Sequence, residues 1–168
     1  NRTSHKPGWK FNEYELKGFP LRIAIGPKDL EKGTVELARR DTLQKQFVSM
    51  DEVSNLVPSL LTEIQNHLYD KALKMQNKGD FVQAAKIYSI LFNNNFRTEE
   101  FFLNYAIVCQ YLRDTNSSIL FLKEAIKINP KNFIPFFKMG FILNNKGSFY
   151  EAYPFAKKAI ELEPNLWQ

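Results

Sequence analysis

The alternation of apolar and polar positions in the first third of the chain predicts short strands. Residues 21–25 alternate apolar side chains with Arg and Ala and stop at Gly26-Pro27, which is typical of a half-buried strand. Residues 34–39 alternate in the same way, and residues 46–48 can form a short third strand. Residues 9–18 instead place apolar side chains at helical spacing and end at a glycine, so a helix is expected there.

A longer apolar stripe with helical spacing follows these strands. Ser49 and Glu52 form a capping-box pattern, which predicts the start of a helix at this point. Pro58 should kink that helix or restart it as a first helical residue. The stripe continues past residue 65 into Ala72 without a Gly-, Ser- or Pro-rich linker, so one helix is expected to join two parts of the chain. Its apolar positions are Val53, Leu56, Val57, Leu60, Leu61, Ile64 and Leu68.

The second part of the chain repeats itself every 34 residues. The three registers are 65–98, 99–132 and 133–166, and a turn of a fourth register begins after them. Small residues recur in pairs at positions 72/84, 106/118 and 140/152. Antiparallel helices approach closely only where both carry small side chains, so these pairs should mark the crossing points. Further cues are capping boxes at Asp80 and Ser148, helix-breaking Pro130 and Pro164, and a kink at Pro154.

This period and its small-residue pattern resemble the tetratricopeptide repeat. The resemblance implies an array of helical hairpins with a groove lined by the first helix of each repeat. An apolar groove of this kind suits a hydrophobic protein segment or peptide, although some of its side chains can equally belong to the core. The groove positions implied by the family register are Tyr69, Leu73, Leu103, Asn104, Ile107, Phe137, Lys138 and Phe141, with Asn145 beside them.

A second resemblance covers residues 7–42. The stretch PGWKFNEYELKGFPLRIAIGPKDLEKG, followed by ARRDT, resembles the anticodon-binding domain of prolyl-tRNA synthetase. That family implies a mixed sheet flanked by helices that holds the anticodon loop of tRNA. Earlier strands of the family domain and its catalytic domain have no counterpart in this sequence, so an open sheet edge is expected.

The resemblance also implies which side chains approach the anticodon bases. Carried over by position, they are Glu15, Arg22, Lys28 and Lys45. A carboxylate can accept hydrogen bonds from a guanine edge, whereas Arg and Lys donate to base acceptors or phosphate. Ala24 stands where the family usually has an acidic residue, so one polar contact of the family pattern is missing.

Composition and reactive residues add little chemistry. The formal net charge is +5, from 23 Lys and Arg against 18 Asp and Glu, which favours a solvated basic surface over strong nucleic-acid attraction. Cys109 has no disulfide partner and is expected in the core, and His67 is expected to stand isolated on a helix surface. We therefore expect no catalytic residues in this chain, no cofactor, no metal, no membrane span and a cytoplasmic location.

The predicted fold class is α+β, with a partial α/β anticodon-binding fragment over residues 1–64 and an all-α tetratricopeptide solenoid over residues 65–168. Three functions remain open. The chain can be a protein-binding scaffold that retains a synthetase-like fragment. It can be the tRNA-binding C-terminal part of a larger prolyl-tRNA synthetase whose catalytic domain carries out aminoacylation. It can also be a chimeric or fragmentary reading frame without a selected function.

Overall fold

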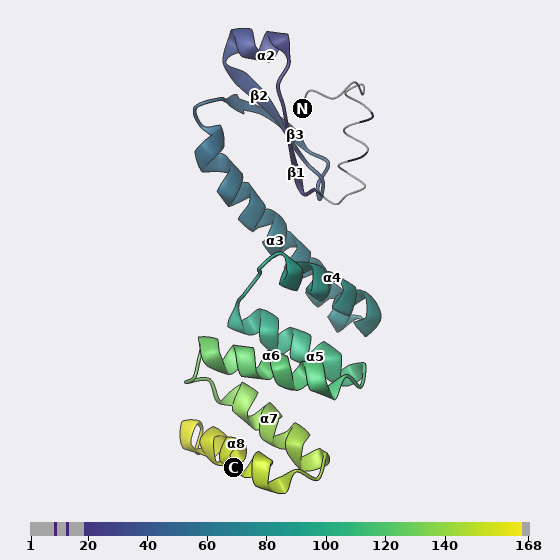
Figure 1. Cartoon of the computed structure of the whole chain (residues 1–168), viewed down its shortest axis with the longest axis vertical. Coiled ribbons are helices and arrows are strands. Elements are labelled where there is room, and N and C mark those ends of the chain that lie inside the picture. Colours follow the sequence, from purple (N-terminus) through teal and green to yellow (C-terminus); the bar gives the residue numbers. More distant parts are fainter. Residues whose placement is uncertain (1–8, 10–12, 14–18, 166–168) are drawn as a thin grey trace. The chain divides into compact units, whose positions relative to one another are not determined.

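The computed structural model describes residues 9, 13 and 19–165, and its contacts divide the chain into two compact units, residues 1–67 and 68–168. Figure 1 shows the strands in the first unit and a series of helices in the second. The helix predicted over residues 9–18 lies outside the described residues, except for Trp9 and Glu13.

An antiparallel sheet forms the centre of the first unit. Among the described residues its strands are β1 (Leu21–Ala24), β2 (Thr34–Arg39) and β3 (Lys45–Ser49), in the order β1-β2-β3. Arg22 lies opposite Ala38, and Glu36 lies opposite Phe47. The alternating pattern therefore predicted the bounds of β2, and β3 extends one residue beyond the prediction at each end.

One face of the sheet packs against helix α3 (Val53–Asn77). Val35 and Leu37 of the central strand are 2% and 1% exposed and form a small core with Leu60 of α3. Ile23 has the same side-chain direction as Leu37 but remains 46% exposed, because β1 lies at an edge of the described sheet. Since side chains alternate between faces along a strand, Arg22, Glu36 and Phe47 point to the opposite face.

A short helix that the hydrophobic pattern did not predict connects β1 to β2. Helix α2 (Pro27–Lys32) begins with a proline at its first position, where the missing N–H costs no hydrogen bond. The Gly26 N–H donates to Asp29 Oδ2 at 2.8 Å, and the helix ends at Gly33 with φ 64°. With six residues the helix is too short to show a helical period.

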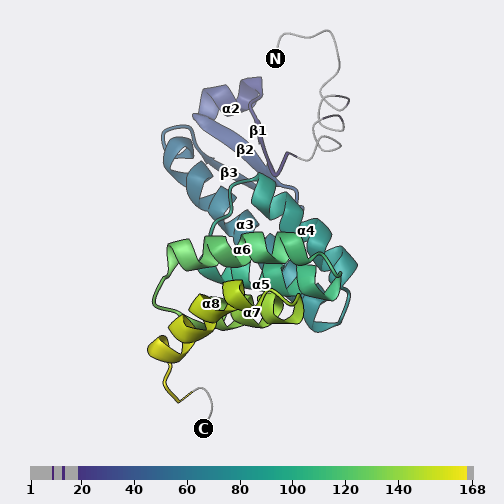
Figure 2. The ribbon, with the colours of Figure 1, turned by 60° about the horizontal axis from the view of Figure 1, so that its bottom comes forward.

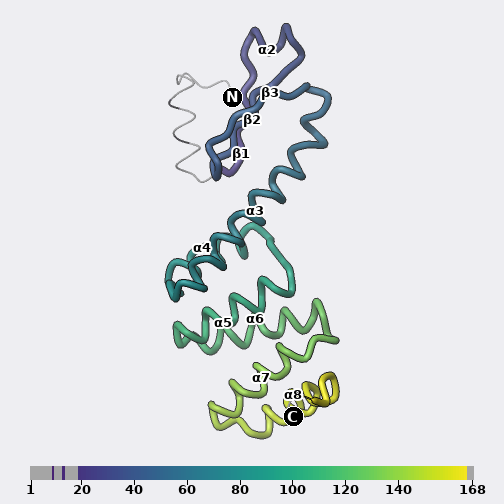
Figure 3. Tube along the Cα trace, turned by 180° about the vertical axis from the view of Figure 1, so that it is seen from behind, coloured from purple at the N-terminus to yellow at the C-terminus, as the bar shows by residue number. Residues whose placement is uncertain are grey.

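Helix α3 starts later than the capping-box pattern predicted. Ser49 is the last residue of β3, paired with Thr34, and its hydroxyl accepts from the Asp51 N–H at 3.4 Å rather than from the N–H of Glu52. The first carbonyl of the helix is that of Glu52, which accepts from the Leu56 N–H at 3.0 Å. The helix then continues through Pro58 to Asn77 as one element, which Figure 3 shows as an unbroken coil.

The second unit is built from helices in sequence. They are the C-terminal part of α3, α4 (Phe81–Asn93), α5 (Glu99–Tyr111), α6 (Thr115–Ile128), α7 (Phe133–Asn145) and α8 (Phe149–Leu162). In Figure 2, α5 lies beside α6 and α7 beside α8, as expected for helical hairpins. Helices α6 and α8 end two residues before Pro130 and Pro164, as predicted.

Two of the hairpins cross at small residues. Ser118 is fully buried, and its hydroxyl donates to the carbonyl oxygen of Ala106 at 3.0 Å. A β-carbon placed on Gly140 would lie 3.2 Å from the backbone nitrogen of Ala156, so Gly140 faces Ala156 of α8, whereas the sequence pattern paired it with Ala152. Ala152 is nevertheless buried.

Only one of the two predicted N-terminal caps in the repeats forms a capping hydrogen bond. Asp80 Oδ1 accepts from the Gln83 N–H at 3.1 Å and caps α4 as predicted. Ser148 occupies the cap position of α8, but its side chain makes no capping hydrogen bond. Pro154 lies inside α8, which continues to Leu162.

Aromatic side chains dominate the core of the second unit. Phe101, Phe102 and Tyr88 are at most 1% exposed, and Phe121 stacks on Tyr105 with ring centroids 4.1 Å apart. Cys109 belongs to the same core, as predicted. No helix in the described part of the chain has both the length and the apolar character to cross a bilayer.

Candidate functional site

A concavity of about 1210 Å³ opens on the sheet face opposite α3 in the first unit. Three of the four residues implied by the anticodon-domain resemblance, Arg22, Lys28 and Lys45, meet around it. They come from β1, α2 and β3, so the fold brings together positions up to 23 residues apart in sequence. The fourth, Glu15, lies outside the described residues. The other lining residues are Phe19, Ala24, Gly26, Pro27, Asp29, Glu36, Ala38, Arg39, Arg40, Leu43 and Phe47.

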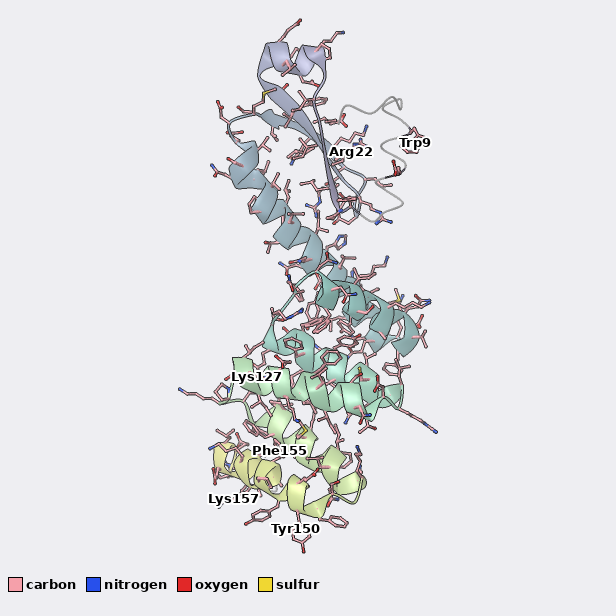
Figure 4. The ribbon with its side chains drawn as sticks, in the orientation of Figure 1. Trp9, Arg22, Lys127, Tyr150, Phe155 and Lys157 are labelled. Atoms are coloured by element: carbon pink, nitrogen blue, oxygen red, sulfur yellow. The ribbon has the colours of Figure 1, made fainter. Side chains whose placement is uncertain are left out.

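The lining carries more positive than negative charge. Its described side chains include five Lys or Arg and two acids, Asp29 and Glu36. Glu36 Oε1 lies 3.1 Å from Arg22 Nη2 and 3.7 Å from Lys45 Nζ, so two cations share one carboxylate. Figure 4 labels Arg22 on the sheet. A surface of this composition favours an anionic ligand.

A network of charges lies at the edge of this concavity. Arg39 Nε and Nη2 donate to the two oxygens of Asp41 at 3.1 and 2.9 Å, and Arg39 Nη1 donates to Glu63 Oε2 at 2.7 Å. His67 Nδ1 lies 2.9 Å from Asp41 Oδ2. Hydrogen bonds from Arg39, and secondarily from His67, hold the pKa of Asp41 well below its ordinary value, and Asp41 in turn raises the pKa of Arg39.

This network corrects the view of His67 as isolated. Its ring is 54% exposed on the surface of α3, as expected, but it contacts Asp41 of the β2–β3 turn. Glu63 and His67 lie 24 and 26 residues from their partners in sequence, so no local pattern pointed to the network. The network joins the turn after β2 to α3 within the first unit.

The concavity also exposes apolar side chains among its cations. Phe47 is 64% exposed and Leu43 is 82% exposed, although both are large and apolar. Neither residue belongs to the set that the family resemblance implies. The signal that could have found Phe47 is its alternation with Lys45 along β3, which places a basic and an apolar side chain on one face.

The positions predicted to line a repeat groove lie on α3, α5 and α7 of the second unit, but their exposure differs. Tyr69 is buried at 8% exposure among core aromatics, so its side chain is not open to a ligand. Leu73 and Leu103 pack partly buried against that core. Ile107, Phe137 and Lys138 are also partly buried, whereas Phe141 is 56% exposed and Asn145 is exposed.

Internal hydrogen bonds occupy the polar groups next to Tyr69. The Tyr88 hydroxyl donates to Gln76 Oε1 at 2.8 Å, Gln76 Nε2 donates to Asn104 Oδ1 at 3.3 Å, and Asn104 Nδ2 donates to the Tyr69 hydroxyl at 2.8 Å. Burial raises the pKa of Tyr69 to about 12. The two hydrogen bonds of Asn104 therefore link α5 to Tyr69 and Gln76 of α3.

A second, smaller concavity of about 470 Å³ lies elsewhere on the repeat unit. Residues of α6, α7 and α8 line it, among them Met139, Phe155 and Lys123, and none of the predicted groove positions does. Figure 4 labels Phe155 on α8. The groove register of the family therefore does not account for this hollow.

Two further observations concern reactive chemistry. Within residues 9, 13 and 19–165, no group of three or more His, Cys, Asp or Glu side chains is arranged to hold a metal ion. Burial raises the pKa of the Cys109 thiol to about 12, which keeps it protonated at neutral pH.

Two family models match separate parts of the chain. The model described as "Anticodon binding domain" matches residues 1–60, and the model described as "Tetratricopeptide repeat" matches residues 99–132 and 136–166. The first of these repeat matches coincides with the second predicted register.

The N-terminal part of the chain is similar in sequence to proline–tRNA ligases. A proline–tRNA ligase of Christiangramia forsetii is 63% identical over 78 residues, which are 46% of this chain and 16% of that ligase. A proline–tRNA ligase of Flavobacterium johnsoniae is 56% identical over 77 residues, again 46% of this chain and 16% of the ligase. The chain thus spans less than a fifth of the length of these relatives.

Solved structures resemble the chain in fold. The type III secretion chaperone SycD of Yersinia enterocolitica, solved with a peptide of the translocator YopD, has a TM-score of 0.56 and 22% identity. That match covers 61% of this chain and 78% of SycD. The structure of MamA gives the same TM-score at 18% identity, with 60% of this chain and 59% of MamA covered. The chain therefore joins a segment similar to the anticodon-binding domain of proline–tRNA ligases to tetratricopeptide repeats.

Proposed function

We propose that this chain is a binding module that recognises RNA through the concavity of its first unit, the RNA being the anticodon loop of a proline-accepting tRNA. The observation that carries the proposal is the meeting of Arg22, Lys28 and Lys45 around one open surface with an excess of positive charge. The 63% identity to a proline–tRNA ligase over 78 residues supports the choice of tRNA. We expect a chain with this function in the cytoplasm.

The chemistry of the surface suits an unpaired loop. Arg and Lys donate to phosphate oxygens and to base acceptors, and exposed aromatic side chains stack on bases that have left a helix. Glu36 keeps Arg22 and Lys45 close together in the absence of ligand. An incoming phosphate can replace that carboxylate as the partner of either cation.

Titration of the full chain with labelled proline-accepting tRNA tests the proposal. We expect Lys28→Ala and Lys45→Ala each to weaken tRNA binding. Each should also lower the slope of log Kd against log salt concentration by about 1, the value expected for the loss of one phosphate contact. Lys157→Ala is the matched control, because Lys157 is an exposed lysine on α8 of the other unit, labelled in Figure 4. Equal binding of tRNA by all three variants and the unchanged chain would reject the concavity as the site.

A second candidate function is the binding of a protein segment by the repeats. The specific observation is the exposed Phe141 on α7, beside the half-buried Lys138 whose pKa is lowered by desolvation. The SycD structure, which shares the fold, holds a peptide of a translocator protein. An apolar peptide segment that carries a carboxylate would suit this surface, because its apolar part can pack on the Phe141 ring and its carboxylate can pair with the partly desolvated Lys138.

Selection from a displayed library of random peptides tests this second function. We expect the unchanged chain to enrich peptides that combine apolar and acidic residues. Phe141→Ala should lose the apolar preference and Lys138→Met the acidic one, whereas Tyr150→Ala on α8 should change neither, since Tyr150 lies outside the predicted groove. Enrichment that is identical for all four chains would place any peptide site elsewhere.

A further inference from the structure

We propose that Leu43, Lys45 and Phe47 form a stacking platform on which the concavity receives an unpaired nucleobase. The inference rests on the proposed RNA-binding function and adds two residues, Leu43 and Phe47, to those that the family resemblance implies. It is carried by three observations: the shared direction of Lys45 and Phe47, the exposure of the side chains, and the backbone conformation at Leu43.

Lys45 and Phe47 lie on one face of β3, and Leu43, in the turn before that strand, lines the same concavity. Phe47 lies opposite Glu36 and Lys45 lies opposite Ala38, and all four residues line the concavity. Positions 45 and 47 have the same parity, so these two side chains of β3 point the same way. Gln46 and Val48 point to the other face, where Val48 packs against the small core. Phe47 is thus directed away from that core.

The exposure of Phe47 and Leu43 has a cost in water. Large apolar side chains at 64% and 82% exposure contribute little to folding, because most of their apolar surface remains in water. Exposed aromatic residues among cations are typical of surfaces that stack on single-stranded nucleic acid, because every base offers a flat apolar face. A bound base would cover Phe47 without a need for a matching pocket.

Leu43 adds a backbone feature. Its φ of 59° lies in the left-handed region, which non-glycine residues seldom adopt, and the Arg39 N–H donates to the Gln44 carbonyl at 2.9 Å across the same turn. This conformation places Leu43 in the lining, at the end of the hairpin. Residues held in such a region often belong to functional surfaces.

Lys45 lies between the two apolar side chains. Its side chain is 58% exposed and its ammonium group contacts Glu36 only at 3.7 Å, so it can turn to a phosphate at little cost. A base on Phe47 and its own phosphate on Lys45 would then be held by neighbouring side chains of one strand. The two contacts differ in their response to salt, because stacking is much less screened than a phosphate contact.

The test measures binding of proline-accepting tRNA by the full chain. We expect Phe47→Ala to raise Kd about 5- to 100-fold with an unchanged salt slope, and Phe47→Tyr to bind like the unchanged chain. Leu43→Ala should weaken binding less. Leu30→Ala is the matched control: Leu30 is 63% exposed on α2 but does not line the concavity, so its Kd should not change.

A set of tRNAs with one abasic nucleotide at each anticodon-loop position identifies the stacked base. The tRNA that lacks the stacked base should bind the unchanged chain and Phe47→Ala equally weakly. The base is missing from the first complex and both base and ring from the second, so neither can form the stacking contact. In addition, the emission of Phe47→Trp should be quenched by tRNA relative to the unchanged chain, a readout that does not depend on the stability of Phe47→Ala.

The outcomes separate the two proposals. If the unchanged chain does not bind the tRNA, the RNA-binding function fails and the platform fails with it. If the chain binds tRNA and loses affinity through Lys28→Ala, but Phe47→Ala binds as tightly as Leu30→Ala and Phe47→Trp is not quenched, only the platform is wrong.

Discussion

At the scale of single residues, Asp41 is the acceptor on which the first unit's charge network depends. Its side chain is 9% exposed and accepts hydrogen bonds from Nε and Nη2 of Arg39, whose Nη1 donates to Glu63. Such a bidentate pair is stronger than a simple surface ion pair. Removal of the carboxylate would leave Arg39 with Glu63 alone and would leave His67 without its partner on the turn.

We therefore predict that Asp41→Asn lowers the free energy of local opening of β2 and β3 by about 1–2 kcal/mol at pH 7. The pKa of Asp41 is held below the ordinary value of about 3.9, so the ionised form stabilises the fold above that pH, and the contribution is lost as the pH falls from about 4 towards the lowered pKa. Amide hydrogen exchange of residues 34–49 measures the effect. Asp41→Asn should show a weaker acid dependence than the unchanged chain, and equal acid dependence would contradict the prediction.

Cys109 allows a second prediction at this scale. Cys109 is 5% exposed and burial raises the pKa of its thiol to about 12, so very little of the reactive thiolate is present at pH 8. Alkylation by iodoacetamide, followed by mass spectrometry, should be slow in buffer and rapid in concentrated urea. Labelling at the unfolded rate in buffer would show that Cys109 is not in the core.

At the scale of elements, periodicity predicted the strands and repeat helices. The exceptions are a capping signal that lies within a strand and a helix too short to show a period. The alternation over residues 34–39 gave the bounds of β2 because both sides of that strand are paired. Ser49 carries a capping signal, but its backbone pairs with Thr34, so the strand extends through it and the helix starts at Val53. Helix α2 has a proline start and a glycine end but no period to find.

The candidate site was predictable only where a family pattern supplied it. Arg22, Lys28 and Lys45 came from the resemblance, and the fold gathers them. Phe47 and the partners of Asp41 required knowledge of which strands and helices meet. Tyr69 was expected in the groove from its register, but the aromatic core of the first hairpin encloses it.

Gly140 provides a prediction at the element scale. A β-carbon there would meet the backbone nitrogen of Ala156 at 3.2 Å, and a helix backbone cannot yield as a flexible side chain does. Gly140→Val should therefore destabilise the repeat unit by about 2–3 kcal/mol in urea unfolding monitored by circular dichroism. Asn144→Val is the control on the same helix: it is exposed, and it introduces the same β-branched side chain without a crossing helix. Equal loss in both variants would assign the effect to helix propensity.

At the scale of the whole molecule, the described residues form cores of different size in the two units. Val35, Leu37 and Leu60 form the core cluster described in the first unit, where Ile64 is also buried, whereas eighteen buried residues form the cluster described in the second. Helix α3 supplies Leu60 to the former and Tyr69 and Ala72 to the latter. Because stability follows buried apolar area, the first unit should open at lower denaturant concentration than the repeats.

Because the cores differ, we predict that the two units unfold independently of each other. Leu60 is 6% exposed, and Leu60→Ala should cost the first unit about 2–4 kcal/mol by leaving a cavity between α3 and the sheet. Hydrogen exchange should then show lost protection in β2, while α5 and α6 keep theirs. Leu122→Ala, at a fully buried position of α6, is the reciprocal variant and should affect only the repeats. If Leu60→Ala lowers protection in α5 and α6 by the same amount, the units unfold together and α3 transmits stability from the sheet to the repeats.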